Sequence, residues 1–390
     1  MLNLTIGDRV EMGGREYLKT RTGASGHAIY GPYAPLDPGR YSVGFVIKPA
    51  DRTKIDSTQL VVAVDVISHG DVVHAKSLVF GSQIDNLSVF TLNFDITDRV
   101  ENFQARVFVN GCIPLMIGDD PLVGLHREDA SASRLNPAPE IIKTHPDQVL
   151  SLFAIGAEVK IIGDDLIGKA TDVAFFVRTQ DDLNFVGEVF FKSIYNVLPP
   201  KPTCLIDIGM NIGFTSLLLA RQDRIVEVHS YEPFTSTFDR AIANISLNPS
   251  SKAKIRANNF GLSDRNEAVT TLIDTDSSGS FSVFSAGQGT KVKIEIRDAS
   301  TILGPIIAAA RSQGRLVILK VDCEGSEFPV FKSLEKSRLL EQVHGFMVEW
   351  HTVWGKLDDL TAPLLRAGYA IMDLSPPTGN GFFYAFRVAN

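Results

Sequence analysis

The stretch CLIDIGMNIGF, residues 204–214, decides the fold of the larger part of this sequence. An apolar run ends at Asp207, and Gly209 and Gly213 then turn the chain into a segment with helical spacing. Glycine lets the backbone pass close to a ligand, and a helix that begins there offers unpaired N–H groups. Such a turn between a strand and a helix is typical of nucleotide-binding α/β folds, although it also occurs without a ligand.

The segments around this turn alternate between strand patterns and helix patterns. The predicted strands are residues 203–208, 225–231, 254–258, 316–321, 345–350, 369–373 and 382–388. The predicted helices are residues 214–221, 234–247, 327–340 and 357–367. This alternation predicts a doubly wound, mostly parallel, seven-stranded sheet of the Rossmann-like type, within a domain that spans residues 151–390.

The N-terminal part of the sequence follows a different pattern. Short runs of β-branched and aromatic residues alternate with turn residues, and no helical period is visible. The predicted strands are residues 41–47, 60–67, 72–80, 88–96 and 103–109. Residues 1–128 are therefore predicted to form an antiparallel β-sandwich. Residues 129–150, which begin with a stretch rich in Ser, Ala and Pro, are predicted to be a linker.

Composition excludes several classes of function. The sequence of 390 residues is 44% hydrophobic and 21% charged, as in ordinary globular proteins, and it has a net charge of −7. The acidic balance argues against binding to nucleic acid or to an anionic membrane surface. We find neither a secretory signal nor an apolar run long enough to span a membrane. Three widely spaced cysteines predict no disulfide framework or zinc site, and a cytoplasmic location fits them best.

Two details of the glycine turn bear on the ligand that it binds. Asn211 replaces the middle glycine of the dinucleotide fingerprint, and its side chain would crowd a pyrophosphate. Asp207 stands at the end of the strand, where a carboxylate suits a cationic amino group. S-adenosylmethionine (SAM) carries an ammonium and a sulfonium group and no phosphate, so the turn favours SAM. NAD bound to an oxidoreductase stays open as an alternative.

The second predicted strand ends at the sequence Tyr-Glu-Pro, residues 231–233. Glu232 follows Asp207 by 25 residues. An acidic residue at the tip of the second strand can accept hydrogen bonds from the two ribose hydroxyls. Glu232 therefore predicts a nucleoside ligand, without separating NAD from SAM.

Further acidic residues follow the later strands. Asp322 and Glu324 come directly after the apolar run 316–321, and Glu349 and His351 lie at the end of the next strand. Asp322 and Glu324 could orient or deprotonate a substrate hydroxyl, or instead cap the following helix and bind local N–H groups. His351 is a candidate general base, or a solvated loop histidine.

Five segments together resemble the FkbM family of SAM-dependent methyltransferases. They are DIGMNIGF (207–214), YEP (231–233), NFGLSD (259–264), KVDCEGSE (320–327) and VEWH (348–351). Their order and spacing fit the family over residues 170–390. The resemblance implies a class I methyltransferase fold and O-methylation, commonly of sugar or polyketide hydroxyls.

The resemblance also implies roles for single residues. The turn that contains Asp207, Gly209, Asn211 and Gly213 would hold the methionine part of SAM, and Glu232 would hold the ribose. The residues expected near the adenine are Asn259, Gly261 and Leu262. Asp322 and Glu324 would face the transferred methyl group. Glu349 and His351, which lie at the end of the next strand, are further candidates for the base. One of these four would accept the proton of the acceptor hydroxyl. No metal is required, although Asp322 and Glu324 carry oxygens that suit Mg²⁺.

The N-terminal part resembles, more loosely, the β-sandwich modules that are fused to bacterial glycan-modifying enzymes. The similar segments are GPYAPLDPGRY (31–41) and FQARVFVNG (103–111). Tyr30, Tyr33 and Tyr41 could stack on sugar rings, and a structural or dimerising domain is the alternative. The predicted function is therefore SAM-dependent O-methylation of a sugar, a glycan or a related small molecule. A non-catalytic glycan-binding protein and an NAD-dependent oxidoreductase remain the alternative functions. The oligomeric state stays open, with a homodimer as one alternative.

Overall fold

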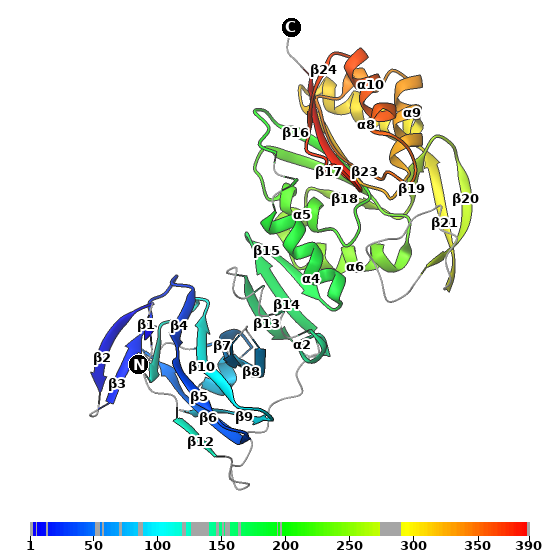
Figure 1. The fold of residues 1–390 in the computed structure, drawn as a ribbon. Helices are drawn as coiled ribbons and strands as arrows, with labels where there is room; N and C mark the ends of the chain where they lie inside the picture. The colour runs from blue at the N-terminus through cyan, green and yellow to red at the C-terminus, as the bar shows by residue number, and fades with distance from the viewer. Residues whose placement is uncertain are drawn as a thin grey trace. The chain divides into compact units, whose positions relative to one another are not determined.

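The computed structural model describes most of the chain, in two compact units (Figure 1). The described residues are 3–4, 6–12, 15–50, 55–56, 58–69, 72–84, 89–118, 122–125, 140–145, 148–149, 152, 157–162, 165–192, 194–195, 197–273 and 290–387. Unit 1 contains Met1–Ala170 and Phe176–Leu183, and unit 2 contains Thr171–Phe175 and Asn184–Asn390.

Unit 1 includes residues that the sequence pattern assigns to the α/β domain. Unit 1 extends to Ala170, whereas the predicted α/β domain begins at residue 151. The predicted linker, residues 129–150, lies for the most part outside the described residues. The linker and the domain limits at 128 and 151 therefore stay predictions.

Unit 1 consists mainly of two antiparallel β-sheets. The first contains β1 (Asn3–Leu4), β4 (Gly26–Tyr30), β10 (Val100–Val109), β7 (Leu60–Ser68) and β8 (Val72–Phe80) in that order, with β5 (Pro32–Leu36) beside β10. The second contains β12 (Leu122–Leu125), β6 (Gly39–Pro49), β11 (Leu115–Gly118), β3 (Arg15–Lys19) and β2 (Asp8–Met12), with β9 (Val89–Ile96) beside β6. Buried side chains of both sheets form one hydrophobic cluster, which includes Val64 and Val107 from the first sheet and Phe45 from the second. The alternation of buried and half-buried residues along β10 places one face of that strand in this core.

The remaining elements of unit 1 are short. They are the helices α1 (Gly81–Ile84) and α2 (Glu140–Thr144) and the antiparallel strands β13 (Glu158–Ile162) and β14 (Asp165–Ala170). Two further elements, β15 (Val173–Val177) and α4 (Gln180–Val186), are divided between the units.

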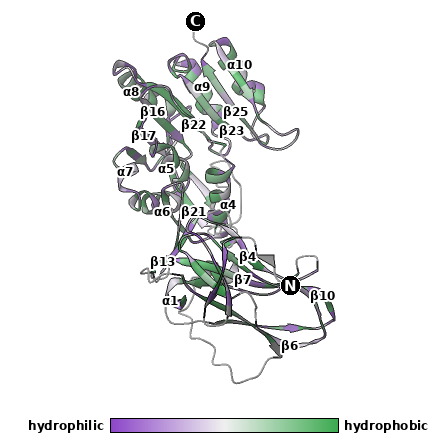
Figure 2. Cartoon of the chain, turned by 90° about the vertical axis from the view of Figure 1, so that its left-hand side faces the viewer, coloured by the Kyte–Doolittle hydropathy of each residue, from purple (hydrophilic) through white to green (hydrophobic). Residues whose placement is uncertain are grey.

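Unit 2 is built on a sheet of seven strands. Its order is β18 (Ile255–Asn258), β17 (Ile225–Tyr231), β16 (Thr203–Ile208), β22 (Leu316–Val321), β23 (Gly345–Trp350), β25 (Gly381–Arg387) and β24 (Tyr369–Asp373). The first five strands pair in parallel, and β25 pairs antiparallel with both β23 and β24. Along β16 and β22, residues on both faces of the sheet are buried and most of them are apolar, as expected for strands that are covered on both sides (Figure 2).

Helices connect the strands of this sheet. They are α5 (Phe214–Ala220), α6 (Thr235–Ser246), α7 (Pro249–Lys252), α8 (Ala299–Ser312), α9 (Glu327–Lys336) and α10 (Leu357–Arg366), with a short 3₁₀ helix at Leu340–Gln342. Buried side chains of α8, α9 and α10, among them Leu303, Phe331 and Leu364, pack with one face of the sheet in a single cluster. The sequence pattern does not predict α8, since Gly304 and Pro305 interrupt its helical period.

Two smaller features of unit 2 lie beside the large sheet. The strands β19 (Gly261–Ser263), β21 (Thr290–Asp298) and β20 (Glu267–Ile273) form a three-stranded sheet. A π-helix at Gly187–Phe191 follows α4. No helix in the described parts of the chain is long and apolar enough to cross a membrane.

Candidate active site

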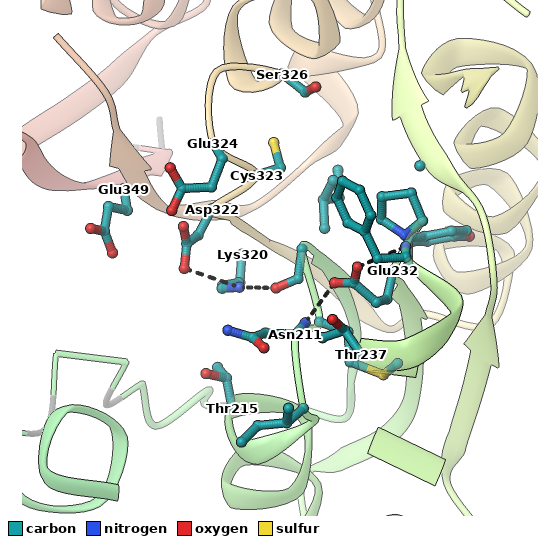
Figure 3. A pocket seen from close by; sticks show the side chains of 18 of the residues that line it. Asn211, Thr215, Glu232, Thr237, Lys320, Asp322, Cys323, Glu324, Ser326 and Glu349 are labelled. Atoms are coloured by element: carbon teal, nitrogen blue, oxygen red, sulfur yellow. Dashed lines mark hydrogen bonds and ion pairs between the residues drawn. The ribbon is translucent and has the colours of Figure 1, made fainter. Parts of the chain in front are cut away.

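A pocket in unit 2 lies at the carboxyl ends of β16, β17, β22 and β23, where parallel strands present their loops to one edge of the sheet. Its two sides carry different groups. In Figure 3, Asp322, Glu324 and Glu349 lie together on one side, and Asn211 and Glu232 lie on the other. Lys320 stands between the two groups.

The loop after β16 approaches the loop after β22 very closely. Gly209 has a φ of +85°, and a Cβ atom there would lie 1.7 Å from the carbonyl oxygen of Asp322. Only glycine fits this position, for reasons of both backbone conformation and space. The glycine turn therefore brings two segments together that are more than a hundred residues apart in the sequence.

A buried ion pair lies beneath this loop. Lys320, which is 2% exposed, points its Nζ at Asp207 Oδ1 at 3.2 Å and donates a hydrogen bond of 2.5 Å to the Gly209 carbonyl. Burial disfavours the ammonium, but the charges of Asp207 and Asp322 outweigh it and raise the pKa of Lys320. Burial raises the pKa of Asp207 while Lys320 opposes that rise. We take the pair as ionised because the lysine is held protonated by two carboxylates.

Asp207 therefore faces a cation that belongs to the chain itself. Asp207 is fully buried and does not line the pocket. Its other carboxylate oxygen, Oδ2, accepts a 2.5 Å hydrogen bond from the Ser216 hydroxyl. Ser216 in turn contacts the hydroxyl of Ser230 at 2.7 Å. These contacts connect the end of β16 to α5 and β17.

Asn211 and Glu232 form the opposite side of the pocket. Asn211 has a φ of +50°, and its backbone N–H donates to Glu232 Oε2 at 3.0 Å. The N–H of Phe234 donates to Glu232 Oε1 at 3.0 Å. Burial raises the pKa of Glu232 to about 7, although these two N–H groups favour its charged form. The side-chain Oδ1 of Asn211 is buried and has no hydrogen-bond partner among the described residues, which is the arrangement expected of an acceptor that awaits a ligand.

The loop after β18 contributes an apolar surface to the same side. Gly261 and Leu262 line the pocket, whereas Asn259 does not. Asn259 donates to the carbonyl of Glu232 at 2.9 Å and accepts from the hydroxyl of Thr235 at 3.0 Å. Its side chain thus fixes the loop after β17.

The other side of the pocket is rich in carboxyl groups. The hydroxyl of Tyr195 lies between two of them, at 3.0 Å from Asp322 Oδ2 and 3.2 Å from Glu349 Oε2. Glu188, from the π-helix, lines the pocket as well. Burial raises the pKa of Glu349 and of Glu188, and the charge of Asp322 adds to the rise for each.

Glu324 and His351 form a separate chain of contacts. His351 Nε2 lies 3.3 Å from Glu324 Oε2, and His351 Nδ1 lies 2.9 Å from Glu327 Oε1. His351 is 5% exposed and does not line the pocket, whereas Glu324 does. Glu324 therefore stands between the pocket and the buried histidine.

Three ligand-type groups of this region lie within 4.8 Å of one another, at Asp322, Glu349 and His351. That spacing suits a metal ion. Both ring nitrogens of His351 already face a carboxylate, at Glu324 and Glu327. The contacts among these groups explain their positions without an ion, and we assign no metal there.

The structure thus brings most of the predicted site residues to one pocket. The predicted residues that line it are Gly209, Asn211, Glu232, Gly261, Leu262, Asp322, Glu324 and Glu349. The predicted residues outside its lining are Asp207, Gly213, Asn259 and His351. Gly213 instead has a φ of +88° at the N-cap of α5.

Sequence reasoning did not assign a role to four residues of this region: Glu188, Tyr195, Lys320 and Glu327. A lysine inside an otherwise apolar strand is a signal that could have pointed to Lys320, because a buried cation needs a counter-ion. Glu188 and Tyr195 precede the first strand of the sheet and match no motif. Only the tertiary fold brings them to the pocket.

Comparison with known proteins gives concordant matches in this part of the chain. Residues 207–371 match the family model described as the methyltransferase FkbM domain. "Methyltransferase 1" of Beauveria bassiana is 26% identical over 212 residues, which are 49% of this chain and 83% of that protein. "Methyltransferase sdnD" of Sordaria araneosa is 25% identical over 231 residues, which are 52% of this chain and 88% of that protein. A solved methyltransferase FkbM of Methylobacillus flagellatus is 17% identical with a TM-score of 0.35, and the match covers 50% of this chain and 46% of that one.

Proposed function

We propose that this chain transfers the methyl group of SAM to a hydroxyl of a sugar, a glycan or a related small molecule, since residues 207–371 match the model of the methyltransferase FkbM domain. The observation that carries the proposal is the pocket itself. Its Asn211 and Glu232 side suits a nucleoside, and its opposite side holds several carboxyl groups that suit a reacting hydroxyl.

The residues present fit SAM. The buried Oδ1 of Asn211 is an acceptor for an ammonium or hydroxyl donor of the ligand. Each oxygen of Glu232 already accepts one backbone N–H and has a lone pair left for a ribose hydroxyl. Gly261 and Leu262 would contact the adenine. The sulfonium group of SAM makes its methyl group reactive, so the chain's task is to align the acceptor and to take up its proton.

The proposed role of Asp207 is indirect. Its carboxylate holds Lys320, and Lys320 holds the Gly209 carbonyl and lies 3.5 Å from Asp322 Oδ2. We propose that this buried pair positions the two loops between which the methionine part of SAM would lie. Gly213 supports the loop after β16 through the start of α5, and Asn259 supports the loop after β17 through its contact with Glu232.

Calorimetric titration tests the choice of cofactor. We expect saturable binding of SAM, and at least tenfold weaker binding in Asp207→Ala and in Glu232→Ala. The control is Glu335→Gln, which removes an exposed carboxylate on α9 that pairs with Arg366. Unchanged SAM affinity in both site variants would overturn the site assignment. Saturable binding of NAD without binding of SAM would favour an oxidoreductase.

The pH dependence of SAM binding is a second test of the nucleoside side. Glu232 has a pKa of about 7, so its carboxylate is present above this pH and is lost below it. Protonation removes an acceptor from the ribose site, and SAM affinity should therefore fall between pH 8 and pH 6. Glu232→Gln should bind weakly and with a flatter pH dependence.

Mass spectrometry tests the acceptor class. The protein is incubated with SAM that carries a labelled methyl group and with a panel of methyl hexopyranosides or a glycan extract. A gain of one labelled methyl group on a sugar hydroxyl is expected. Transfer only to amines or to nucleic acid would contradict the proposal.

For unit 1 we propose a β-sandwich that binds glycans. Tyr33 supports this role, since its ring is 43% exposed and meets the ring of Tyr30 edge-on at 6.3 Å. Tyr41 does not, because it stacks on Phe94 against the core. On a glycan array, the full chain should lose binding in Tyr33→Ala and keep it in Tyr41→Phe. Equal binding by both variants would exclude Tyr33 as a sugar contact.

A further inference from the structure

Glu327 is a buried carboxylate that the proposed binding of SAM does not use. It is 0% exposed, at the first position of α9. Its Oε2 accepts from the N–H of Gly325 at 2.8 Å, and its Oε1 accepts from the N–H of His351 at 2.9 Å. A carboxylate that is buried so completely requires such donors, and they fix its orientation.

His351 connects this carboxylate to the pocket. Because a carboxylate oxygen accepts, the 2.9 Å contact between Nδ1 and Glu327 Oε1 places a proton on Nδ1. The ring then directs Nε2 toward Glu324 Oε2 at 3.3 Å. Burial opposes a charge on the ring, but the hydrogen bond to Glu327 and the charges of Glu324, Glu327 and Asp322 raise the pKa of His351. Protonated His351 therefore links two carboxylates.

Glu324 is held at the pocket by an unusual backbone conformation. Glu324 has a φ of +50°, and Gly325 after it has a φ of +103°. A Cβ on Gly325 would lie 2.6 Å from the indole of Trp354, so the loop packs closely against that ring. A left-handed glutamate persists only where the surroundings determine it, as at functional sites. The loop thus presents the Glu324 carboxylate to the pocket on a fixed support.

The other carboxyl groups of this side are less suited to accept a proton. Asp322 accepts from the hydroxyl of Tyr195 and faces Lys320 at 3.5 Å, and neither contact offers a path for a proton. The hydroxyl of Tyr195 also lies 3.2 Å from Glu349 Oε2, and burial together with the charges of Asp322 and Glu188 raises the pKa of Glu349. Burial raises the pKa of Glu324 to about 7, with Asp322 and Glu327 adding to the rise and His351 opposing it. That value is close to the pH at which a general base is most effective.

We propose that Glu324 is the proton acceptor of methyl transfer, and that His351 and Glu327 are positioning residues that orient its carboxylate and hold it ionised. This inference rests on the proposed function and goes beyond it, because it selects one base and assigns two supporting residues. In the step, the acceptor oxygen forms a bond to the methyl carbon and the C–S bond breaks, its electron pair remaining on sulfur. The hydroxyl proton passes to Glu324 and from there to solvent.

Titration followed by NMR tests the chain of contacts without any acceptor. The protein is labelled with ¹³C and ¹⁵N in histidine and glutamate, and His351→Gln and Glu324→Gln identify the two signals. In the native chain His351 should titrate above the ordinary histidine pKa, and Glu324 above the ordinary glutamate pKa. Glu327→Gln should lower the pKa of His351 by at least one unit, since the imidazolium loses its buried partner. His351→Gln should raise the pKa of Glu324, since its carboxylate loses a neighbouring positive charge. Glu335→Gln should leave both values unchanged.

Kinetics test the role of Glu324 with the methyl hexopyranoside that gives the most product. Glu324→Gln should lower kcat at least 100-fold and change SAM affinity less than twofold. In His351→Gln the rate should still rise with pH, but the midpoint of that rise should move to higher pH, since Glu324 has lost a neighbouring positive charge. A purely structural role for His351 would lower the rate without moving the midpoint.

The outcomes separate this inference from the proposed function. If SAM does not bind to the native chain, the proposed function fails. If SAM binds but the Glu324 signal titrates at an ordinary acidic pH and does not respond to His351→Gln, only the inference fails. Transfer that survives in Glu324→Gln and is lost in Glu349→Gln would also overturn it.

Discussion

At the scale of single residues, the geometry of the site depends on a few tightly packed contacts between its loops. Gly209 brings the loop after β16 against the backbone of Asp322, and Lys320 ties the same loop to the buried Asp207. Both contacts determine how far apart the two loops stand, and therefore the width of the pocket.

Gly209→Ala should damage the pocket through space as well as through backbone strain. The new Cβ would collide with the Asp322 carbonyl, so the loops must separate, and SAM affinity should fall at least tenfold by calorimetry. Gly368→Ala is the matched control, because Gly368 has a φ of +83° and no atom within 4 Å of the Cβ position. Gly368→Ala introduces the same backbone strain of about 1–3 kcal/mol without a collision, and it should bind SAM with native affinity. Equal SAM affinity in the two variants would contradict this account.

Lys320→Met should destabilise unit 2 strongly. It removes the cation that faces the fully buried Asp207, and breaking a buried pair in this way costs about 3–5 kcal/mol. Urea unfolding measures the loss. The double variant Lys320→Met with Asp207→Asn should recover part of the stability, since no unpaired carboxylate remains. If the double variant loses as much free energy of unfolding as the two single variants lose together, the two residues do not act as a pair.

At the scale of elements, α8 begins at a well-formed cap. Asp298, the N-cap residue, accepts from the N–H of Thr301 at 2.8 Å and from the hydroxyls of Ser300 and Ser333 at 2.6 and 2.9 Å. The last contact ties the start of α8 to α9, the helix that carries Glu327. Burial raises the pKa of Asp298, but these hydrogen bonds outweigh burial and lower it to about 2.

Asp298→Ala should cost about 1 kcal/mol in the free energy of unfolding at pH 7. Because the pKa of Asp298 is lower in the folded chain, its contribution is present above the unfolded value near 3.8. It is lost as the pH falls through about 2. Urea unfolding at pH 7 and at pH 3 should therefore show a smaller difference between the variant and the native chain at pH 3. A difference independent of pH would show that the charge does not contribute.

The elements also show how far the sequence patterns reach. The predicted strands 203–208, 225–231 and 316–321 coincide with β16, β17 and β22. Apolar runs bounded by turn residues identify buried parallel strands well. The predicted strands do not include β20 and β21, although Val292, Ile294 and Ile296 alternate with charged residues along β21. The π-helix at Gly187–Phe191 shows no comparable pattern.

At the scale of the whole molecule, every residue that lines the pocket lies between Phe185 and Glu349, in unit 2. Residues 171–175 also belong to this unit. Phe175 is fully buried, and its ring packs against Phe190 at 5.2 Å and Phe214 at 5.0 Å. Unit 2 therefore needs a piece of chain that precedes α4.

A fragment of residues 151–390 should bind SAM with the affinity of the full chain, and a fragment of residues 184–390 should not fold stably. Phe175→Ala in the full chain tests whether residues 171–175 stabilise unit 2, and it should lower the free energy of unfolding by about 3–5 kcal/mol. Phe191→Ala, at a ring that is 37% exposed, should cost much less. Normal stability of the shorter fragment, by thermal unfolding, would show that residues 171–175 are dispensable.

The strands of the large sheet, the glycine turn and the acidic residues at the strand ends could be predicted from the amino-acid sequence alone. These features are local, since they depend on the spacing of apolar residues and on the conformational freedom of glycine. Only the tertiary structure decided which residues meet. Tyr195 contacts Asp322 and Glu349 across more than a hundred residues of chain, and Lys320 faces Asp207 in the same way. Such pairings follow from strand order and burial, which no local pattern encodes.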